Sequence, residues 1–465
     1  MPDPFRHYEG VPVPDLPSDP PSPEAPALDI LRGASGIPVA TDGPAFLSQL
    51  MFYSAAISAS KCVPSTGYRY ALRVNPSSGN LHPTEFHFLA RGLKEWPDGL
   101  YHYRPSAHMA EQRALGDLEL KSTDGSSPLV FVLTSIAWRE AWKYGERAYR
   151  YCLHDIGHAW QALTLAAQAI GCESFAIGCF RDDEVAERCR LHEDEWPMLI
   201  VELRGKSIPI QESDARETLW YGGQANQLSK ETIEFPLIDA IHNATKLSNC
   251  SGQGISSAEP VRTGSGAIKL PAPTLSNRPF GEVARMRRSA LDFVGGTRMI
   301  SLGQLSAMLG VTCQPFHADF GGASYIQIYL YAHRVEGLQP GVYTFWPERG
   351  ELEQIKSGDQ RVVAAGLSLG QDLAGNACVA FSMIGDLRRA ASTSGDRGYR
   401  YVHFEAGAIG HRLYLAAEAL GLGATGIGAF FDDEVHRYLE VAPDQGQVVY
   451  HFAIGYPVPD PRLEP

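Results

Sequence analysis

Hydrophobic positions along the chain predict two similar blocks of secondary structure. In each block an amphipathic segment comes first, short strands rich in Phe, Tyr and Leu follow, and a continuous apolar run predicts a buried strand. A long helix with apolar residues on nearly all of its faces comes next, and a short acidic helix and a last strand close the block. The predicted elements before that short helix are 44–59, 84–90, 99–103, 129–137 and 146–170, then 301–309, 324–331, 341–345, 377–384 and 396–420.

The two blocks are copies of one another. Tyr149-Arg150-Tyr151 recurs as Tyr399-Arg400-Tyr401, and the same offset relates Gly157 to Gly407 and Asp182 to Asp432. A period this long is typical of a duplicated domain and not of a solenoid. Because two similar domains in one chain usually mimic a homodimer, we expect the two long apolar helices to lie centrally or at their interface.

The copies and their flanks divide the chain into four segments. The strands gather around helices without strict βαβ alternation, which indicates the α+β class. The first segment is rich in Pro and predicts an extended arm, and the third is poor in periodicity and reads as a linker. The four segments are an arm at 1–40, a first domain at 41–205, a linker at 206–280 and a second domain at 281–465.

Composition and charge narrow the classes of function. The 465 residues include 40 Lys and Arg against 53 Asp and Glu, a net charge of −13 that gives no footprint for nucleic acid or an anionic membrane. No apolar run approaches the roughly 20 residues of a membrane helix. The segment 1–8 has no apolar signal core, and the 8 cysteines form no C-x-x-C pair. These features predict a cytoplasmic protein with reduced thiols.

One polar loop is a candidate ligand cradle. It consists of Pro76, Ser77, Ser78, Gly79 and Asn80. Serine hydroxyls, the Asn amide and exposed backbone N–H groups suit the edge of a planar heteroaromatic ring, although the same residues also suit a plain tight turn. The second copy has the sequence Ala-Asp-Phe-Gly-Gly-Ala at 318–323 instead, so only one copy keeps the polar version.

Two further motifs carry charge. Arg287-Arg288-Ser289 opens the second copy, and two guanidinium groups with a hydroxyl suit a phosphate. A solvated basic helix face is the plainer reading. Lys143-Tyr144 precedes the long helix of the first copy and is replaced in the second by Thr393-Ser394. In a site such a pair transfers protons, whereas on the surface it is an ordinary lysine beside a tyrosine.

Two other patterns resemble a dinucleotide-binding motif and a zinc site, but their context argues against both. Gly421–Gly426 fits G-x-G-x-x-G, but it follows a helix, which indicates a glycine-rich helix exit open to a ligand and not a Rossmann turn. His154 and His158 have the spacing of a zinc pair but no evident third ligand, and the second copy has Phe404 and Ala408 there. They are read as core or interface histidines, and no metal site is predicted.

Together these motifs resemble the nitroreductase-fold flavoproteins, and specifically a tandem member of the SagB-type dehydrogenases. The resemblance covers nearly the whole chain outside the linker. It rests on Arg73–Glu85, Lys143–Tyr151, the helix exits Gly171–Phe180 and Gly421–Phe431, and Gly455–Arg462. It implies two domains packed as an intramolecular pseudo-dimer, with FMN in the interface, and a chain that is a monomer in solution.

The resemblance also implies where FMN is held. One complete site takes the Arg-Arg-Ser and helix-exit segments from the second copy and the polar loop from the first. The reciprocal site lacks the Arg-Arg-Ser and polar-loop motifs. One FMN per chain is therefore expected. Leu291 stands where the family often has a second basic residue, which leaves phosphate binding weaker or more dependent on Arg462. The expected FMN-binding residues are Arg287, Arg288, Ser289, Pro76, Ser77, Ser78, Gly79, Asn80, Gly426, Ile427, Gly428, Ala429 and Arg462.

In azoline dehydrogenases of this family the residues that match Lys143 and Tyr144 are implicated in removing the substrate proton. The resemblance therefore implies oxidation of a thiazoline or oxazoline in a modified peptide, or of another small amine-derived ring, with hydride transfer to the flavin. Two alternatives stay open. One is reduction of nitroaromatics or quinones with NAD(P)H as electron donor, and the other is a degenerate flavin-binding protein without turnover.

Overall fold

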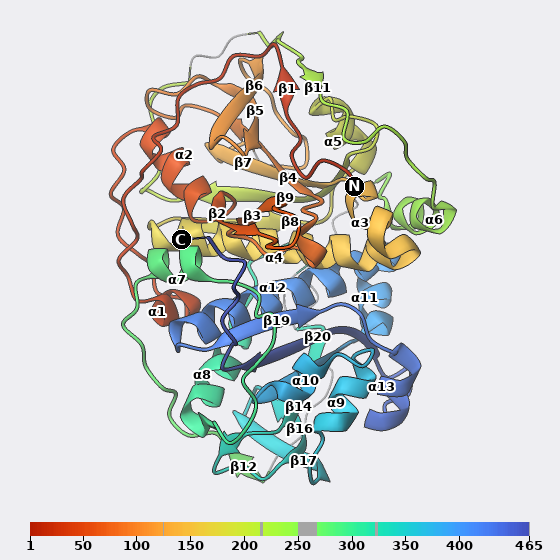
Figure 1. The fold of residues 1–465 in the computed structure, drawn as a ribbon. Coiled ribbons are helices and arrows are strands. Elements are labelled where there is room, and N and C mark those ends of the chain that lie inside the picture. Colours follow the sequence, from red (N-terminus) through yellow and green to blue (C-terminus); the bar gives the residue numbers. More distant parts are fainter. Residues whose placement is uncertain (124, 214–216, 250–266, 321–323, 465) are drawn as a thin grey trace.

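The computed structural model describes residues 1–123, 125–213, 217–249, 267–320 and 324–464. The chain forms two domains stacked on one another, with two long helices running side by side between them (Figure 1). Each domain combines one seven-stranded antiparallel sheet with helices, so the predicted α+β class with two tandem domains is confirmed. In the described part of the chain, no helix combines the length and apolar character needed to cross a bilayer.

The two sheets correspond strand for strand. Their strand orders are β10-β6-β5-β4-β7-β9-β8 and β12-β17-β16-β14-β18-β20-β19. The first sheet contains Leu219–Trp220, Met109–Leu115, Gly99–Arg104, Thr84–Ala90, Leu129–Ser135, Trp196–Arg204 and Glu173–Ile177, in that order. The second contains Ile268–Lys269, Glu351–Ser357, Gly341–Trp346, Ile326–Ala332, Val379–Gly385, Gln447–Gly455 and Gly423–Ile427. Small two-stranded sheets add β1 Tyr8–Glu9 with β11 Gln224–Ala225, β2 Ile57–Cys62 with β3 Arg69–Arg73, and β13 Ile300–Ser301 with β15 Val335–Glu336.

The helices also repeat between the domains. The long pair is α4 Ala148–Ala169 and α12 Gly398–Ala419, and most of their residues are buried. The shorter helices are α1 Ala27–Leu31, α2 Gly43–Phe52, α3 Trp138–Tyr144, α5 Asp182–Arg188, α6 Pro236–Thr245, α7 Phe280–Met286, α8 Leu302–Thr312, α9 Arg361–Leu367, α10 Asp372–Asn376, α11 Leu387–Ser394 and α13 Asp432–Leu439. A single 3₁₀ turn separates α3 from α4, and another separates α11 from α12.

The long helices contact each other backbone to backbone at a pair of glycines. A Cβ added to Gly157 would lie 2.1 Å from the carbonyl oxygen of Phe404, and a Cβ added to Gly407 would lie 2.2 Å from that of His154. No side chain fits in either place, so only glycine permits this approach. The prediction that these helices form the interface is therefore confirmed, and the repeated glycines are part of the reason.

Charged groups at the helix ends reinforce the interface from both sides. Arg397, just before α12, and Arg400 in its first turn each contact the Asp182 carboxylate of the other domain at 2.8 Å, and all three side chains are buried. Half-buried ion pairs of the same kind join Arg147, just before α4, and Arg150 in its first turn to Asp432. Because each acid is the first residue of a short helix, its charge also suits the positive end of the helix dipole.

The arm and the linker contain more structure than the sequence indicated. The arm runs along one side of both domains (Figure 1), contains α1, and pairs β1 with β11 of the linker segment. The linker also contains α6, whereas its residues 250–266 lie outside the described residues. Both segments therefore bridge the two domains.

One predicted helix is wrong in part. The range 44–59 was expected to be one amphipathic segment, but α2 ends at Phe52 and Ile57 begins the hairpin of β2 and β3. The reason is a change of period, because Ile-Ser-Ala-Ser-Lys-Cys alternates polar and less polar residues as a strand does. The pattern also missed β6, β17 and the short helices α3, α9, α10 and α11.

We expect Gly157→Ala to destabilise the protein strongly, because its methyl group would meet backbone atoms that cannot move aside. Overpacking of this kind costs about 1–3 kcal/mol. Gly310→Ala is the matched control, since Gly310 is a helical glycine with open space around it and the change should be neutral or stabilising by about 0.4–1 kcal/mol. Thermal denaturation followed by circular dichroism compares the two, and equal melting temperatures would contradict a tight crossing.

We also expect the chain to be a monomer in solution. The long helices cover each other within one chain, which leaves no unpaired copy of that interface for a second chain. Multi-angle light scattering measures the mass directly. A tight dimer at nanomolar concentration would show that another surface performs the association.

Candidate active site

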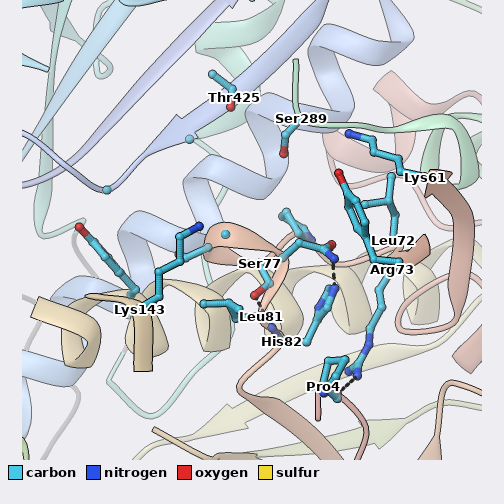
Figure 2. A pocket seen from close by; sticks show the side chains of 18 of the residues that line it. Pro4, Lys61, Leu72, Arg73, Ser77, Leu81, His82, Lys143, Ser289 and Thr425 are labelled. Atoms are coloured by element: carbon cyan, nitrogen blue, oxygen red, sulfur yellow. Dashed lines mark hydrogen bonds between the residues drawn. The ribbon is translucent and has the colours of Figure 1, made fainter. Parts of the chain in front are cut away.

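A cavity of about 1100 Å³ lies between the two domains. The first domain contributes β3, the polar loop after it and α3, while the second contributes the segment after α7 and the β19 exit. Residues 1–5 of the arm form a further part of the wall. Figure 2 shows this assembly, with Ser289 and Thr425 at one end of the view and Pro4, Arg73 and His82 at the other.

The structure brings every residue that was expected to bind FMN or transfer a proton to this cavity. They are Lys143, Tyr144, Pro76, Ser77, Ser78, Gly79, Asn80, Arg287, Arg288, Ser289, Gly426, Ile427, Gly428, Ala429 and Arg462. The exception to the family pattern, Leu291, also lines the cavity and is 47% exposed. Residues far apart in the chain thus share one pocket because α4 and α12 hold the domains together.

The polar loop is fastened from below by α4. The Asp155 carboxylate accepts hydrogen bonds from Ser78 N at 3.1 and 3.2 Å and from Ser78 Oγ at 3.1 Å. The Asn80 amide donates to Ala71 O at 2.9 Å, and Ser77 Oγ accepts from His82 N at 2.8 Å. Each polar side chain of the loop therefore has a protein partner.

Carboxyl groups beneath the loop are deeply buried. Burial raises the pKa of Asp155 to about 7, although hydrogen bonds from Ser77 and Ser78 act in the opposite direction. Burial, and then the nearby Asp155, raise the pKa of Glu140 well above its usual range. Both groups lie close to α3, so the charge facing Lys143 from below is reduced.

The opposite end of the cavity is cationic. Arg287 is buried, and its Nε and Nη2 donate to Val74 O at 3.1 Å and Arg73 O at 3.0 Å, while its Nη1 has no described partner. Arg288 donates to Ser58 at 3.0 and 3.2 Å and is paired with no described carboxylate. Burial, and then the adjacent Arg287, lower the pKa of Arg288 to about 10. An anion bound at this end would give Arg287 Nη1 a partner and would offset the burial of the unpaired Arg288 charge.

Two more cations surround the same end. Lys61 and Arg462 both contact the Asp460 carboxylate, at 2.9 and 2.7 Å. The hydrogen bond from Arg462, and the one from Lys61, hold the pKa of Asp460 well below its usual range, although burial acts in the opposite direction. One carboxylate shared between two cations leaves a net positive charge beside Ser289, which suits a phosphate group. Sequence reasoning missed Lys61, because it lies beyond the predicted amphipathic segment 44–59, in a hairpin that the pattern did not predict.

The helix-exit segment offers backbone donors. Gly428 N and Ala429 N line the cavity wall, and neither donates a hydrogen bond to another described residue. In the first copy the equivalent amides of Gly178 and Cys179 both donate to the Asp319 carboxylate, at 2.7 and 2.9 Å. Polar backbone groups normally have partners in folded proteins, so the open pair at 428–429 indicates a ligand with acceptor atoms.

The reciprocal position is filled by the protein itself. Phe320 stacks on Tyr401 with ring centroids 4.2 Å apart, and a Cβ added to Gly178 would lie 2.6 Å from the Phe320 ring. Together with the Asp319 carboxylate, this ring occupies the place that is open on the other side. The chain therefore has one open site of this kind within the described residues.

Lys143 and Tyr144 meet at the polar loop. A Cβ added to Gly79 would lie 2.4 Å from Tyr144 Oη and 3.2 Å from Lys143 Nζ, so both polar atoms lie directly against the Gly79 backbone. Lys143 is exposed and no described carboxylate forms an ion pair with it. In Figure 2 it extends toward the loop that carries Ser77, across the pocket from Lys61.

These residues fit FMN. A phosphate suits the cationic end, and the acceptor atoms of a flavin ring suit the open amides of Gly428 and Ala429. The fit rests on the unpartnered Arg287 Nη1 and on those two amides. The described residues include no group of three His, Cys, Asp or Glu side chains placed to hold a metal ion. His154 and His158 are buried in the helix interface.

The sequence analysis missed several lining residues. Tyr151, Tyr414, Tyr450, Gln371 and the arm residues 1–5 all face the cavity. The tyrosines belong to elements that read as apolar core, and nothing in the local pattern distinguishes a core tyrosine from one at a cavity wall. For Tyr414 and Tyr450 the other copy gives a signal, since it has Thr164 and Leu199 in their places, whereas Tyr151 is repeated as Tyr401.

Comparison with known proteins agrees with this architecture. The chain is 30% identical over 181 residues to a Methanocaldococcus jannaschii protein whose name places it among nitroreductases, covering 37% of this chain and 90% of that protein. A crystal structure from Anabaena variabilis, titled as a nitroreductase, is 25% identical with a TM-score of 0.76, covering 98% of this chain and 94% of that one. The family model described as Nitroreductase family matches twice, at residues 59–206 and 303–456. The chain therefore belongs to the nitroreductase family.

Proposed function

We propose that this nitroreductase-family oxidoreductase is FMN-dependent and acts as a SagB-type dehydrogenase in the cytoplasm. Its substrate is an azoline-like ring, in a modified peptide or a small molecule. The observation that carries the proposal is the meeting of Lys143 Nζ and Tyr144 Oη against Gly79, inside the one cavity that also gathers the cationic end and the open amides. Proton-transfer groups and cofactor-binding groups thus share one chamber.

The residues divide into three tasks. Arg287, Arg288, Ser289 and Arg462, with Lys61, bind the FMN phosphate, while Gly426–Ala429 and Pro76–Asn80 hold the ring from the two domains. When bound, FMN supplies a hydride acceptor or donor at its ring. The open Gly428 and Ala429 amides are fixed by their backbone, so they orient acceptor atoms at little entropic cost.

Lys143 and Tyr144 handle the proton. Burial, and then Glu140, raise the pKa of Tyr144, so its phenol keeps its proton and serves as a hydrogen-bond donor at Oη. Lys143 is the base in this pair: its neutral amine accepts at Nζ the proton of the substrate carbon next to the atom that loses hydride, and it becomes an ammonium as the double bond forms. Since no carboxylate of the described residues forms an ion pair with the exposed Lys143, its side chain can move between the loop and the substrate.

A reductase that uses NAD(P)H is the alternative, and the cavity is large enough for a second molecule beside the cofactor. Adding NADPH to the yellow protein under anaerobic conditions separates the two. Rapid bleaching of the flavin absorbance would favour the reductase. Persistent colour, followed by bleaching with an azoline peptide, supports the dehydrogenase, and persistent colour with every substrate would leave the protein a flavin binder.

We expect one FMN per chain. The Asp319 carboxylate and the Phe320 ring fill the reciprocal position, and that side also has no Arg-Arg-Ser segment. Flavin released by heat and measured by absorbance, relative to protein concentration, gives the stoichiometry. A value near two would show that Asp319 and Phe320 move aside for a second cofactor.

We expect Lys143→Ala to abolish turnover and retain FMN, whereas Arg288→Ala weakens FMN binding. Loss of a proton-transfer group typically costs about 10²–10⁴-fold in rate. Loss of one charge-assisted phosphate contact costs about tenfold to a hundredfold in affinity, with the smaller effect expected because Arg287 and Arg462 remain. Flavin content after gel filtration and turnover are measured on the same samples.

Lys206→Ala is the control for a change of charge alone, since Lys206 is exposed and does not line the cavity. It should keep both activity and flavin. If Lys143→Ala keeps full activity, or loses its flavin, then Lys143 is not the base and the assignment of roles is wrong.

A further inference from the structure

A buried tyrosine and histidine form a polar pair behind the β19 wall of the cavity. Tyr450 Oη lies 3.0 Å from His158 Nε2. Tyr450 is in the middle of β20 of the second domain and lines the cavity, while His158 is on α4 of the first domain. Both residues are nearly inaccessible to solvent, at 6% and 2% exposure. The pair thus crosses the domain interface, where the rings of His411 and Tyr414 also pack against His158.

Glycines make the room that this pair needs. A Cβ added to Gly426 would lie 1.9 Å from Tyr450 Oη, and one added to Gly410 would lie 2.8 Å from His158 Cε1. The ring of His154 stacks on Tyr450 with centroids 4.3 Å apart and an angle of 16° between the planes. The hydroxyl is therefore held directly against the strand that the proposed FMN site uses as its wall.

The other copy provides an internal comparison. The strand pairs Leu133–Leu199 and Met383–Tyr450 occupy the same register, so Leu199 is the counterpart of Tyr450. The offset of 250 residues makes Ala408 the counterpart of His158 and Ala176 that of Gly426. Tyr450, His158 and Gly426 are thus replaced by apolar side chains at the reciprocal position that Phe320 fills. The pair therefore exists only beside the open cavity.

Both groups are neutral where they stand. Burial, and then Arg287, lower the pKa of His158 to about 3, and burial, then Tyr414, raise the pKa of Tyr450. A neutral imidazole that donates Nε2–H to Tyr450 Oη leaves the phenol O–H free to donate elsewhere. No described residue other than His158 hydrogen-bonds to this hydroxyl, so the cavity is the direction left to it.

We propose that Tyr450, oriented by His158, donates a hydrogen bond from its hydroxyl to the bound flavin and so favours the reduced form of the cofactor. The inference rests on the proposed FMN site. Reduced flavin carries more electron density on its polar atoms than oxidised flavin, so a fixed donor stabilises it more. Tyr450 is the contacting residue, and His158 is a positioning residue.

The test is the midpoint reduction potential of the bound flavin, measured by anaerobic titration against a reference dye. Tyr450→Phe should lower the potential, His158→Ala should lower it by the same amount or less, and the double variant should do no more than Tyr450→Phe alone, because the pair acts as a unit. FMN affinity should fall by no more than about tenfold, as expected for one neutral hydrogen bond.

Tyr331→Phe is the matched control, because its hydroxyl bonds Ser382 at 3.2 Å within the sheet and does not line the cavity. Its potential should equal that of the unaltered protein. An unchanged potential in folded, FMN-loaded Tyr450→Phe would overturn the inference, as would the same shift in Tyr331→Phe. Failure of the unaltered protein to bind FMN would instead overturn the proposed function, so the two failures are distinguishable.

Discussion

The backbone contact between α4 and α12 at Gly157 and Gly407 is the constraint on which the rest of the structure depends. Each helix also carries, two residues earlier, the acid that fastens its own domain's loop. Asp155 binds Ser78, and Glu405 accepts a hydrogen bond from Tyr325 N at 3.0 Å. Because the glycines fix how closely the helices approach, they also fix how each loop faces the strand exit of the other domain. Substituted glycines would move both cavity walls apart together.

The packing of the two domains is symmetric, but the side chains at the two equivalent interface positions differ. The buried contacts of Asp182 and the half-buried contacts of Asp432 are made by equivalent arginines, so the skeleton of both interface sides is retained. The differences lie in the side chains placed on it. The open side has the free amides, the cationic end and the Tyr450–His158 pair, whereas the other side has Asp319 and Phe320. Duplication within one chain allows this, because each half then mutates independently, which a true homodimer does not permit.

The sequence predicts the duplicated fold and the local motifs well, because short segments of the chain are enough to recognise both. The repeat around Tyr149 and the apolar helices need no knowledge of distant contacts. Lys61, Tyr450 and the arm residues 1–5 are different, since each lines the cavity beside segments hundreds of positions away. Lys61 forms a bridge with Leu463, Tyr450 bonds to His158, and Asp3 N donates to Leu228 O. A buried tyrosine in a strand has the same local pattern whether it faces a core or a cavity. What identifies Tyr450 is the comparison with Leu199, which requires the register of both sheets.

The filled position also explains how the chain tolerates losing one site. An emptied site would leave the amides of Gly178 and Cys179 without partners beside an apolar void, and each unpartnered buried polar group costs about 1–3 kcal/mol. The Asp319 carboxylate pairs with both amides and Phe320 fills the void, so this side is stable without a ligand. On the open side, no carboxylate or ring of the described residues takes the equivalent place at Gly428 and Ala429. Its remaining stabilisation comes from whatever binds there, which links the stability of the whole two-domain frame to the occupancy of a single cavity.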